Sequence, residues 1–276
     1  MKSINTLKKA SLATLLTFVL SFSFVFAQND TMYIMKSGVI VGQYNVNTEV
    51  DSVIFYKPTI EETTSGTFID SRDGNEYNWV QIGDQVWMAE NLAYLPSVNM
   101  VADGSEDAAG SYYYVYGYDG TNVADAKATD NYATYGVLYN WTAAMDGEAS
   151  STTNPSGIQG VCPAGWHLPS DAEWKELTNY LGGTSVAGGK LKETGTTHWA
   201  SPNTGATNET GFTALPGGAR DYDGIFGNIG NHGVWWSSTE SDTNSASYRY
   251  LDYDYSYLSS NGYDKKVGFS VRCVRD

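Results

Sequence analysis

The chain has 276 residues, of which 41% are hydrophobic, and a formal net charge of −15 at pH 7. A strongly acidic chain repels the phosphates of nucleic acids, and no basic stripe is present, so a nucleic acid partner is not expected. The length is enough for one large domain, or for one domain with a small appendage.

Residues 1–27 are predicted to form a signal peptide. Three lysines precede the apolar run ASLATLLTFVLSFSFVFA, which ends in a small-x-small site at Ala27. The run approaches the length of a membrane span, but its Ser and Thr residues and the Ala27 site favour cleavage. Loss of the three lysines would change the formal charge from −15 to −18. We therefore expect a secreted, periplasmic or cell-surface protein without a membrane span after cleavage.

Two short segments are expected before the main domain. Residues 28–57 hold short apolar runs that alternate with polar positions, which predicts a β leader of two or three strands. Residues 58–66 are polar and contain Pro and Gly, as is typical of a linker. The main domain is then expected over residues 67–276.

The main domain begins with the pattern of a β-meander. The turn signals Asp73-Gly74 and Gly83-Asp84 separate short runs of strand-forming residues. Further along, residues 135–145 predict a short helix with Leu138, Trp141 and Met145 on one side.

The clearest helix is expected after Ser170. Ser170 and Glu173 have the spacing of a capping box, in which each side chain accepts a hydrogen bond from the other residue's backbone amide. Trp174, Leu177 and Leu181 then recur at the spacing of a core-facing helix side. Two glycines follow Leu181 and end the helix.

Two strands are expected in the last third of the chain. Residues 247–260 alternate Tyr with Asp and predict a strand with two different faces. Residues 267–276 also alternate, with Val267, Phe269 and Val271 on one face, and predict the last core strand.

The two cysteines of the chain, Cys162 and Cys273, are expected to pair, because cysteines of exported proteins are usually oxidised. The bond would close a loop of about 112 residues and stabilise the fold by roughly 4–5 kcal/mol through the unfolded state.

Five segments resemble the blocks of the Fibrobacter succinogenes major paralogous domain (FISUMP), in the same order. Together they cover about residues 67–276, and the leader resembles a short β segment that often precedes this domain in secreted Bacteroidetes-type proteins. The segments read DGNEYNWVQIGDQVWMAENLAY, GVCPAGWHLPSDAEWKEL, GFTALPGGARDYDG, WWSSTES and GFSVRCVRD.

The same blocks are more distantly similar to the formylglycine-generating sulfatase-modifying enzymes. This resemblance implies an α+β, C-type-lectin-like fold with twisted antiparallel sheets, about two helices and long loops. It also implies that the terminal cysteine is structural and pairs with a distant one, in agreement with the expected bond. Ser247 and Asp252 stand where those enzymes have their thiol pair. Without thiolates the copper and sulfur chemistry of that group is not expected.

Other catalytic patterns are absent from the sequence. His167, His198 and His232 lack metal-ligand spacing, and no nucleophile elbow is present. His167, beside Trp166, is interpreted as a structural residue. We therefore expect no enzymatic activity, with a hydrolase of unrecognised site as an alternative.

A binding role is the main functional expectation. Exposed aromatic rings with polar partners favour recognition of a glycan or of a cell-surface protein. An alternative is that the tryptophans and half of the tyrosines pack the core. A separate alternative function is that of a structural or adhesive component of a cell-surface assembly. The candidate ligand-binding residues are Trp235, Trp236, Tyr248, Arg249, Tyr250, Asp252, Tyr253 and Tyr255.

No cofactor is firmly expected, and calcium is the candidate considered. Side-chain oxygens gather at Asp221, Asp223, Asn228 and Asn231. The Glu-Pro-Asn and Trp-Asn-Asp motifs of calcium-dependent lectins are absent, so sugar binding by that route is not predicted.

Overall fold

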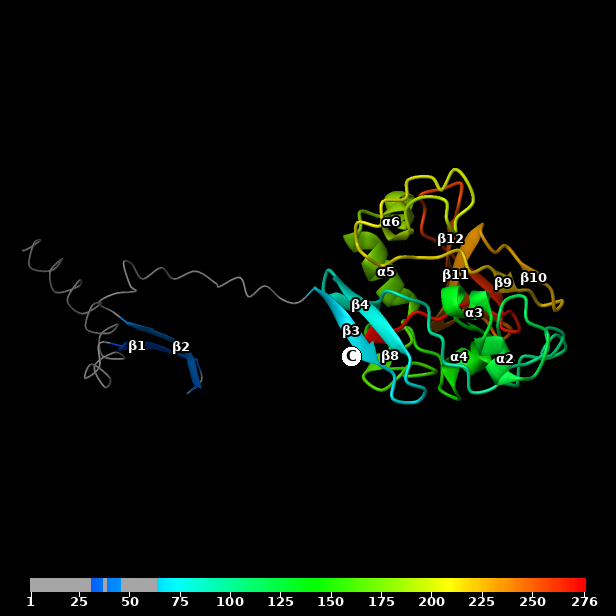
Figure 1. Cartoon of the computed structure of the whole chain (residues 1–276), viewed down its shortest axis with the longest axis horizontal. Helices are drawn as coiled ribbons and strands as arrows, with labels where there is room; N and C mark the ends of the chain where they lie inside the picture. Colours follow the sequence, from blue (N-terminus) through cyan, green and yellow to red (C-terminus); the bar gives the residue numbers. More distant parts are fainter. Residues whose placement is uncertain (1–30, 37–38, 46–63) are drawn as a thin grey trace, which may run out of the picture. The chain divides into compact units, whose positions relative to one another are not determined.

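The computed structural model describes residues 31–36, 39–45 and 64–276. The chain divides into two compact units, residues 1–60 and residues 61–276 (Figure 1). The predicted signal peptide lies outside the described residues, as does most of the predicted linker.

In the described residues of the first unit, two strands form an antiparallel pair. β1 (Thr31–Lys36) pairs with β2 (Val39–Asn45), with an irregularity between Ile34 and Met35. These are two of the two or three strands expected in the leader. Residues 46–57, where a third was expected, lie outside the described residues.

The second unit opens with the predicted meander. Within the meander, the turn between residues 76–82 and residues 85–88 passes through Gly83. Its φ of 64° is left-handed and therefore suits glycine. Five strands form this sheet in the order β3-β4-β5-β14-β8, with every neighbouring pair antiparallel. The strands are β3 (Ser65–Ile69), β4 (Glu76–Ile82), β5 (Gln85–Met88), β14 (Val274–Arg275) and β8 (Trp166–His167).

A second sheet, of three antiparallel strands, has the order β11-β12-β13. Two small antiparallel pairs accompany it, and the pair β9–β10 lies beside β11 and β12 in Figure 1. The strands are β11 (His232–Glu240), β12 (Ser245–Asp252), β13 (Ser259–Asp264), β6 (Tyr113–Tyr114), β7 (Leu138–Tyr139), β9 (Ala219–Arg220) and β10 (Phe226–Gly227).

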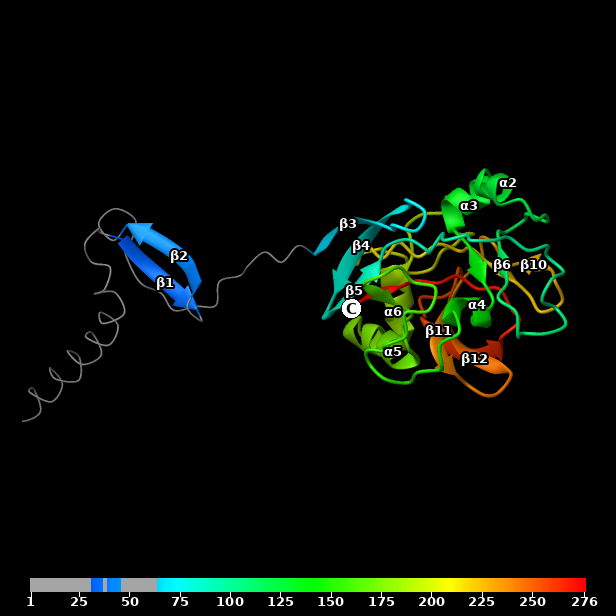
Figure 2. The same ribbon diagram turned by 90° about the horizontal axis from the view of Figure 1, so that it is seen from below.

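Five helices occur in the described residues, more than the two or so that the distant resemblance implied. The three short ones each begin at a side-chain cap within a loop, and only the one at residues 141–145 overlaps a helix that the sequence pattern predicts. Figures 1 and 2 both place α5 beside α6, away from α2 and α3. The helices are α2 (Val123–Lys127), α3 (Asp130–Tyr135), α4 (Trp141–Met145), α5 (Asp171–Tyr180) and α6 (Thr184–Leu191). Helices and small antiparallel sheets together make the fold α+β.

The predicted helix after Ser170 is confirmed as α5. Both bonds of the capping box are present: Ser170 Oγ accepts from the Glu173 amide at 3.2 Å, and Glu173 Oε2 accepts from the Ser170 amide at 2.9 Å. Trp174 and Leu177 are fully buried and Leu181 is nearly so. The local pattern was sufficient here because both the cap and the core face lie within one short segment.

The helix predicted over residues 135–145 is shorter than expected. Asn140 is the N-cap, and its Oδ1 accepts a hydrogen bond from the Ala143 amide at 3.0 Å. The helix therefore begins at Trp141, and Leu138 lies in strand β7 instead.

The Tyr- and Asp-rich segment predicted as one strand over residues 247–260 contains a break. β12 ends at Asp252, whose Oδ1 accepts a hydrogen bond from the Asp254 amide at 2.8 Å and so begins a turn. The chain returns as β13 at Ser259.

The last predicted strand is mostly irregular and is buried on both sides. Phe269 bonds to Tyr139, the Trp236 amide donates to Ser270, and the Leu92 amide donates to Val271. Because the segment changes neighbour at each step, only Val274–Arg275 forms regular strand. Val267, Phe269 and Val271 are buried, and the intervening Arg272 is buried as fully as they are.

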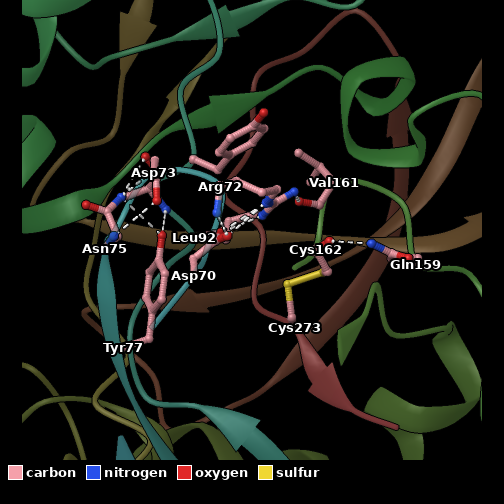
Figure 3. Close-up of polar contacts among 12 residues, drawn as sticks. Asp70, Arg72, Asp73, Asn75, Tyr77, Leu92, Gln159, Val161, Cys162 and Cys273 are labelled. Carbon is pink, nitrogen blue, oxygen red and sulfur yellow. Dashed lines mark hydrogen bonds and ion pairs between the residues drawn. A yellow bond between two sulfur atoms is a disulfide. The ribbon is translucent and has the colours of Figure 1, made fainter. Parts of the chain in front are cut away.

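The predicted disulfide between Cys162 and Cys273 is present (Figure 3). Next to it, Arg72 donates to both Asp70 carboxylate oxygens and to the Val161 carbonyl at 2.9 Å. Burial acts to raise the pKa of Asp70, but the hydrogen bonds and charge of Arg72 lower it overall. The disulfide and this ion pair join the first hairpin, the loop before α5 and the terminal segment.

Candidate ligand-binding site

One face of the β11-β12-β13 sheet carries most of the candidate site. Successive side chains of a strand point to opposite faces, so Tyr248, Tyr250 and Asp252 share one face of β12. The register places His232 directly opposite Asp252, and Tyr263 of β13 opposite Ala246. This face is referred to below as the tyrosine face, and it is defined by Tyr248, Tyr250, Asp252, Tyr263 and His232.

A cavity of about 390 Å³ opens over the tyrosine face. Its other walls come from the β9–β10 hairpin and from Phe269 of the terminal segment. The cavity is therefore assembled from segments that are far apart in the sequence. Its aromatic lining is Tyr248, Tyr250, Tyr263 and Phe269, and its main polar lining is Asp221, Asn228, His232 and Asp252.

Tyr248 lies at the centre of the aromatic lining. The centroid of its ring is 4.9 Å from that of Phe269, 5.7 Å from Tyr250 and 5.9 Å from Tyr263. Burial raises the pKa of Tyr248 to about 12, and the neighbouring Tyr250 and Tyr263 contribute to the rise. The phenol therefore stays neutral at ordinary pH and can donate a hydrogen bond. Among the described residues, no protein group bonds to the hydroxyl of Tyr248 or Tyr250, which leaves both available to a ligand.

The polar lining consists of carboxylates that are partly engaged. Asp252 Oδ2 lies 3.1 Å from His232 Nε2, and Asp221 Oδ1 lies 3.4 Å from the Tyr263 hydroxyl. Burial, followed by the charge of Asp221, raises the pKa of Tyr263. No lysine or arginine lines the cavity. The site thus offers flat aromatic surfaces beside hydrogen-bond acceptors, with no fixed positive charge.

The structure places Trp235 and Trp236 in the core. Both indoles are at most 1% exposed, and their Nε1 atoms donate to Asn91 Oδ1 and to the Tyr139 carbonyl, each at 2.8 Å. Neither ring can meet a ligand, and we leave both out of the candidate site. Residues 233–239 of β11 are buried, so both of its alternating faces are covered over most of the strand.

Arg249 is also directed away from the tyrosine face. Its Nη1 donates to Asp171 Oδ1 at 2.6 Å and to Ser260 Oγ at 2.7 Å, and its side chain is 4% exposed. The guanidinium joins the sheet to the first turn of α5. Because Arg249 alternates with Tyr248 and Tyr250 along β12, its side chain lies on the opposite face of the sheet. Arg249 therefore binds α5 and does not line the cavity.

Tyr253 and Tyr255 lie beyond the end of β12. Tyr255 is 55% exposed, and its ring stacks against Tyr257 with centroids 5.7 Å apart. Tyr255 and Tyr257 line a smaller hollow of about 150 Å³. Tyr253 is half-buried and lines neither hollow.

The residues considered for calcium belong to two turns, residues 221–224 and 228–231, on either side of β10. The Asp221 and Asp223 carboxylates accept hydrogen bonds from the amides of Tyr222 and Ile225, at 2.8 and 3.1 Å. Of the four, Asp221 and Asn228 line the cavity, whereas Asp223 and Asn231 do not. The described part of the chain contains no group of three or more His, Cys, Asp or Glu residues that could hold a metal ion.

Comparison with known protein families agrees with the sequence motifs. A family model described as the Fibrobacter succinogenes major domain matches residues 80–275. The chain belongs to this family. No curated protein and no solved structure matches the chain.

Within this Fibrobacter succinogenes major domain, the two positions compared above with a thiol pair do not meet. Ser247 and Asp252 are five residues apart on the same strand and point to opposite faces of the sheet. Ser247 Oγ is instead 2.9 Å from Ser241 Oγ.

The three histidines of the domain all face carboxylates. His167 lies between Glu173 Oε1, at 2.6 Å, and Asp276 Oδ1, at 2.8 Å. His198 is 2.9 Å from Glu193, and His232 is paired with Asp252. In the described residues no serine, threonine or cysteine side chain is hydrogen-bonded to any of them. A nucleophile–base pair is therefore not assembled here.

Pattern reasoning missed three residues of the site, His232, Tyr263 and Phe269. They come from two other strands and from the terminal segment, and only the pairing of β11, β12 and β13 brings them to Tyr248. Nothing local to each residue signals this proximity.

In the described residues, no helix is long and apolar enough to cross a membrane.

Proposed function

We propose that the protein is an exported, non-catalytic carbohydrate-binding module whose ligand occupies the cavity over the tyrosine face. The observation that carries this proposal is the combination of neutral phenols with the Asp221 and Asp252 carboxylates around one opening. Sugar rings present apolar C–H faces that pack on aromatic rings, and hydroxyls that donate to carboxylates.

The cavity is also suited to a ligand that exchanges readily. Tyr250 and Asp252 are half-buried, so part of each side chain is exposed to solvent and a ligand can reach it without any rearrangement of the protein. Tyr248 rests on Phe269 beneath it, which holds the ring in place before the ligand arrives. Such preorganisation lowers the entropic cost of binding.

We further propose a C-type-lectin-like arrangement for the domain and a location outside the cytoplasm. The fold proposal is supported by the distant motif resemblance and by the α+β architecture of small antiparallel sheets joined by long loops. The location proposal is supported by the basic and apolar segment that ends at Ala27. Measurement of the N-terminal residue of the protein recovered from culture medium and cell envelope tests the latter.

A glycan array with the purified protein tests the binding proposal. We expect Tyr250→Ala to abolish the signal and Tyr180→Ala to leave it unchanged, because Tyr180 is an exposed tyrosine on α5, outside the cavity. An array without signal above background contradicts the proposal. A stable crosslinked complex in envelope fractions, with no glycan affinity, would instead favour a structural component of a surface assembly.

A further inference from the structure

A second hollow adjoins the cavity over the tyrosine face. It has a volume of about 150 Å³ and shares Tyr250 and Asp252 with the larger cavity. Its remaining lining comes from Tyr255, Tyr257 and Ser259. Since the same two residues line both openings, the two hollows are neighbours on one continuous surface.

The tyrosines of the second hollow are exposed although their rings are ordered against each other. Tyr255 and Tyr257 are 55% and 48% exposed, and their rings stack with an interplanar angle of 19°. Neither ring belongs to the two buried clusters of the core. The pair therefore forms an aromatic surface that the stability of the core does not require.

The backbone beneath this tyrosine pair is firmly held. Lys192 is fully buried, and its Nζ donates to the carbonyls of Asp252, at 3.0 Å, and Tyr255, at 2.8 Å. A Cβ on Gly188 would lie 2.3 Å from the Tyr257 carbonyl oxygen, so α6 approaches the loop as closely as a glycine allows. The loop thus presents the second aromatic surface in a fixed position relative to Tyr250.

The charges around the two hollows exclude one class of ligand. The ionisable lining outside the tyrosines is Asp221, Asp252 and His232, and neither hollow has a lysine or arginine in its lining. Lys192 is directed at backbone carbonyls and is not part of either lining. Acidic sugars would meet two carboxylates without a compensating cation.

We infer that the two hollows are consecutive subsites for a linear oligosaccharide without acidic groups, with one sugar over Tyr248 and the next against Tyr255 and Tyr257. This inference rests on the proposed carbohydrate-binding function and specifies its ligand class. The stacked rings of the second subsite extend the contact in one direction from Tyr250, so a chain of two or more sugars gains contacts that a single sugar lacks.

The test is a calorimetric titration of the purified protein with glucose, N-acetylglucosamine and their β-1,4-linked oligomers of two to six units. We expect affinity for the tetramer of at least one series to exceed that of its monomer by about tenfold. Tyr257→Ala should remove this gain and leave monomer binding unchanged, and Tyr257→Phe should restore it because stacking needs only the ring. Galacturonate oligomers of the same length should bind at least tenfold more weakly.

The controls separate the possible failures. Tyr257 is about half exposed, and an unchanged thermal midpoint would show that its variants are folded. Equal affinity for monomer and tetramer, an unaffected tetramer affinity in Tyr257→Ala, equally tight galacturonate, or no binding of either neutral series would each overturn the inference. A blank glycan array overturns the proposed function itself, whereas array signals with no chain-length dependence overturn the second subsite alone.

Discussion

The buried ammonium group of Lys192 holds the backbone of Tyr255, with Nζ 2.8 Å from the carbonyl oxygen. Burial lowers the pKa of Lys192 to about 8, although Asp252 and Asp254 act in the opposite direction. A side chain of the core thus supports the surface on which we place the second subsite. The cost of burying the cation is offset in part by its two bonds to carbonyls.

This burial makes stability depend on pH. Between pH 8 and 10.5 the unfolded lysine binds more protons than the folded one, so the free energy of unfolding should rise with pH, by up to about 1.4 kcal/mol per unit. Lys192→Met should lack this rise, as measured by urea unfolding between pH 7.5 and 9.5, below the range in which tyrosines ionise. Lys190→Met is the matched control, because Lys190 is a partly exposed lysine paired with Glu209. An equal pH slope in wild type and Lys192→Met would contradict the assignment.

His167 should stabilise the fold most at acidic pH. Burial acts to lower the pKa of His167, but hydrogen bonds and charges from Glu173 and Asp276 raise it overall. A raised folded pKa gives stability that is complete below the unfolded value near 6.5 and is lost as pH rises through the folded value. We expect His167→Gln to cost about 2–3 kcal/mol at pH 5.5 and clearly less at pH 9 in urea unfolding.

His198→Gln is the control for that measurement. His198 is also paired with a carboxylate, of Glu193, but its side chain is 30% exposed. The variant should change stability by less than about 1 kcal/mol at either pH. A destabilisation by His167→Gln that increases with pH would contradict a raised pKa of His167 in the folded protein.

The disulfide should contribute strongly to stability. Cys162 and Cys273 are separated by 111 residues, and their bond restricts the unfolded chain. Replacing both by serine should lower the free energy of unfolding by about 3–5 kcal/mol. Guanidinium unfolding of the variant and of wild type, with and without reductant, checks this. Identical midpoints for reduced and oxidised wild type would contradict it.

Arg249 and Tyr250 are adjacent but should respond differently to substitution. Arg249→Met removes the link to Asp171 and Ser260 and should cost about 2 kcal/mol of stability, with glycan affinity retained in the folded fraction. Tyr250→Ala should lose affinity with a cost below about 1 kcal/mol, since its ring is half-buried at the cavity. Thermal unfolding and titration of both variants distinguish the two roles, and loss of affinity in folded Arg249→Met would contradict them.

Much of the scaffold could be predicted because its signals are local. The Ser170–Glu173 capping box spans one helical turn, and the Gly83 turn lies between two adjacent strands. With two cysteines in the chain, the disulfide had one possible pairing. The helix over residues 135–145 was misjudged because Asn140 starts it only after a short strand, which an apolar periodicity does not reveal.

The site was harder to predict because alternation does not say which face of a strand is exposed. The alternation of β12 places Tyr248, Tyr250 and Asp252 on one face and Arg249 on the other, so the expectation that all four bind a ligand was wrong for Arg249. Trp235 and Trp236 were expected to bind a ligand because aromatic rings favour recognition, but both are buried because β11 packs against other segments on each side. A period of two identifies the two faces but not the partners that cover them.

The sequence by itself determined the short-range features of this protein: the cap of α5, the opening meander and the identity of the two paired cysteines. Only the tertiary structure decided that His232, Tyr263 and Phe269 join Tyr248 around one cavity. The physical reason is that caps and turns are made by residues a few positions apart, which the chain itself keeps close. The cavity depends on strand register and on the terminal segment, which are set by packing between residues far apart in the sequence.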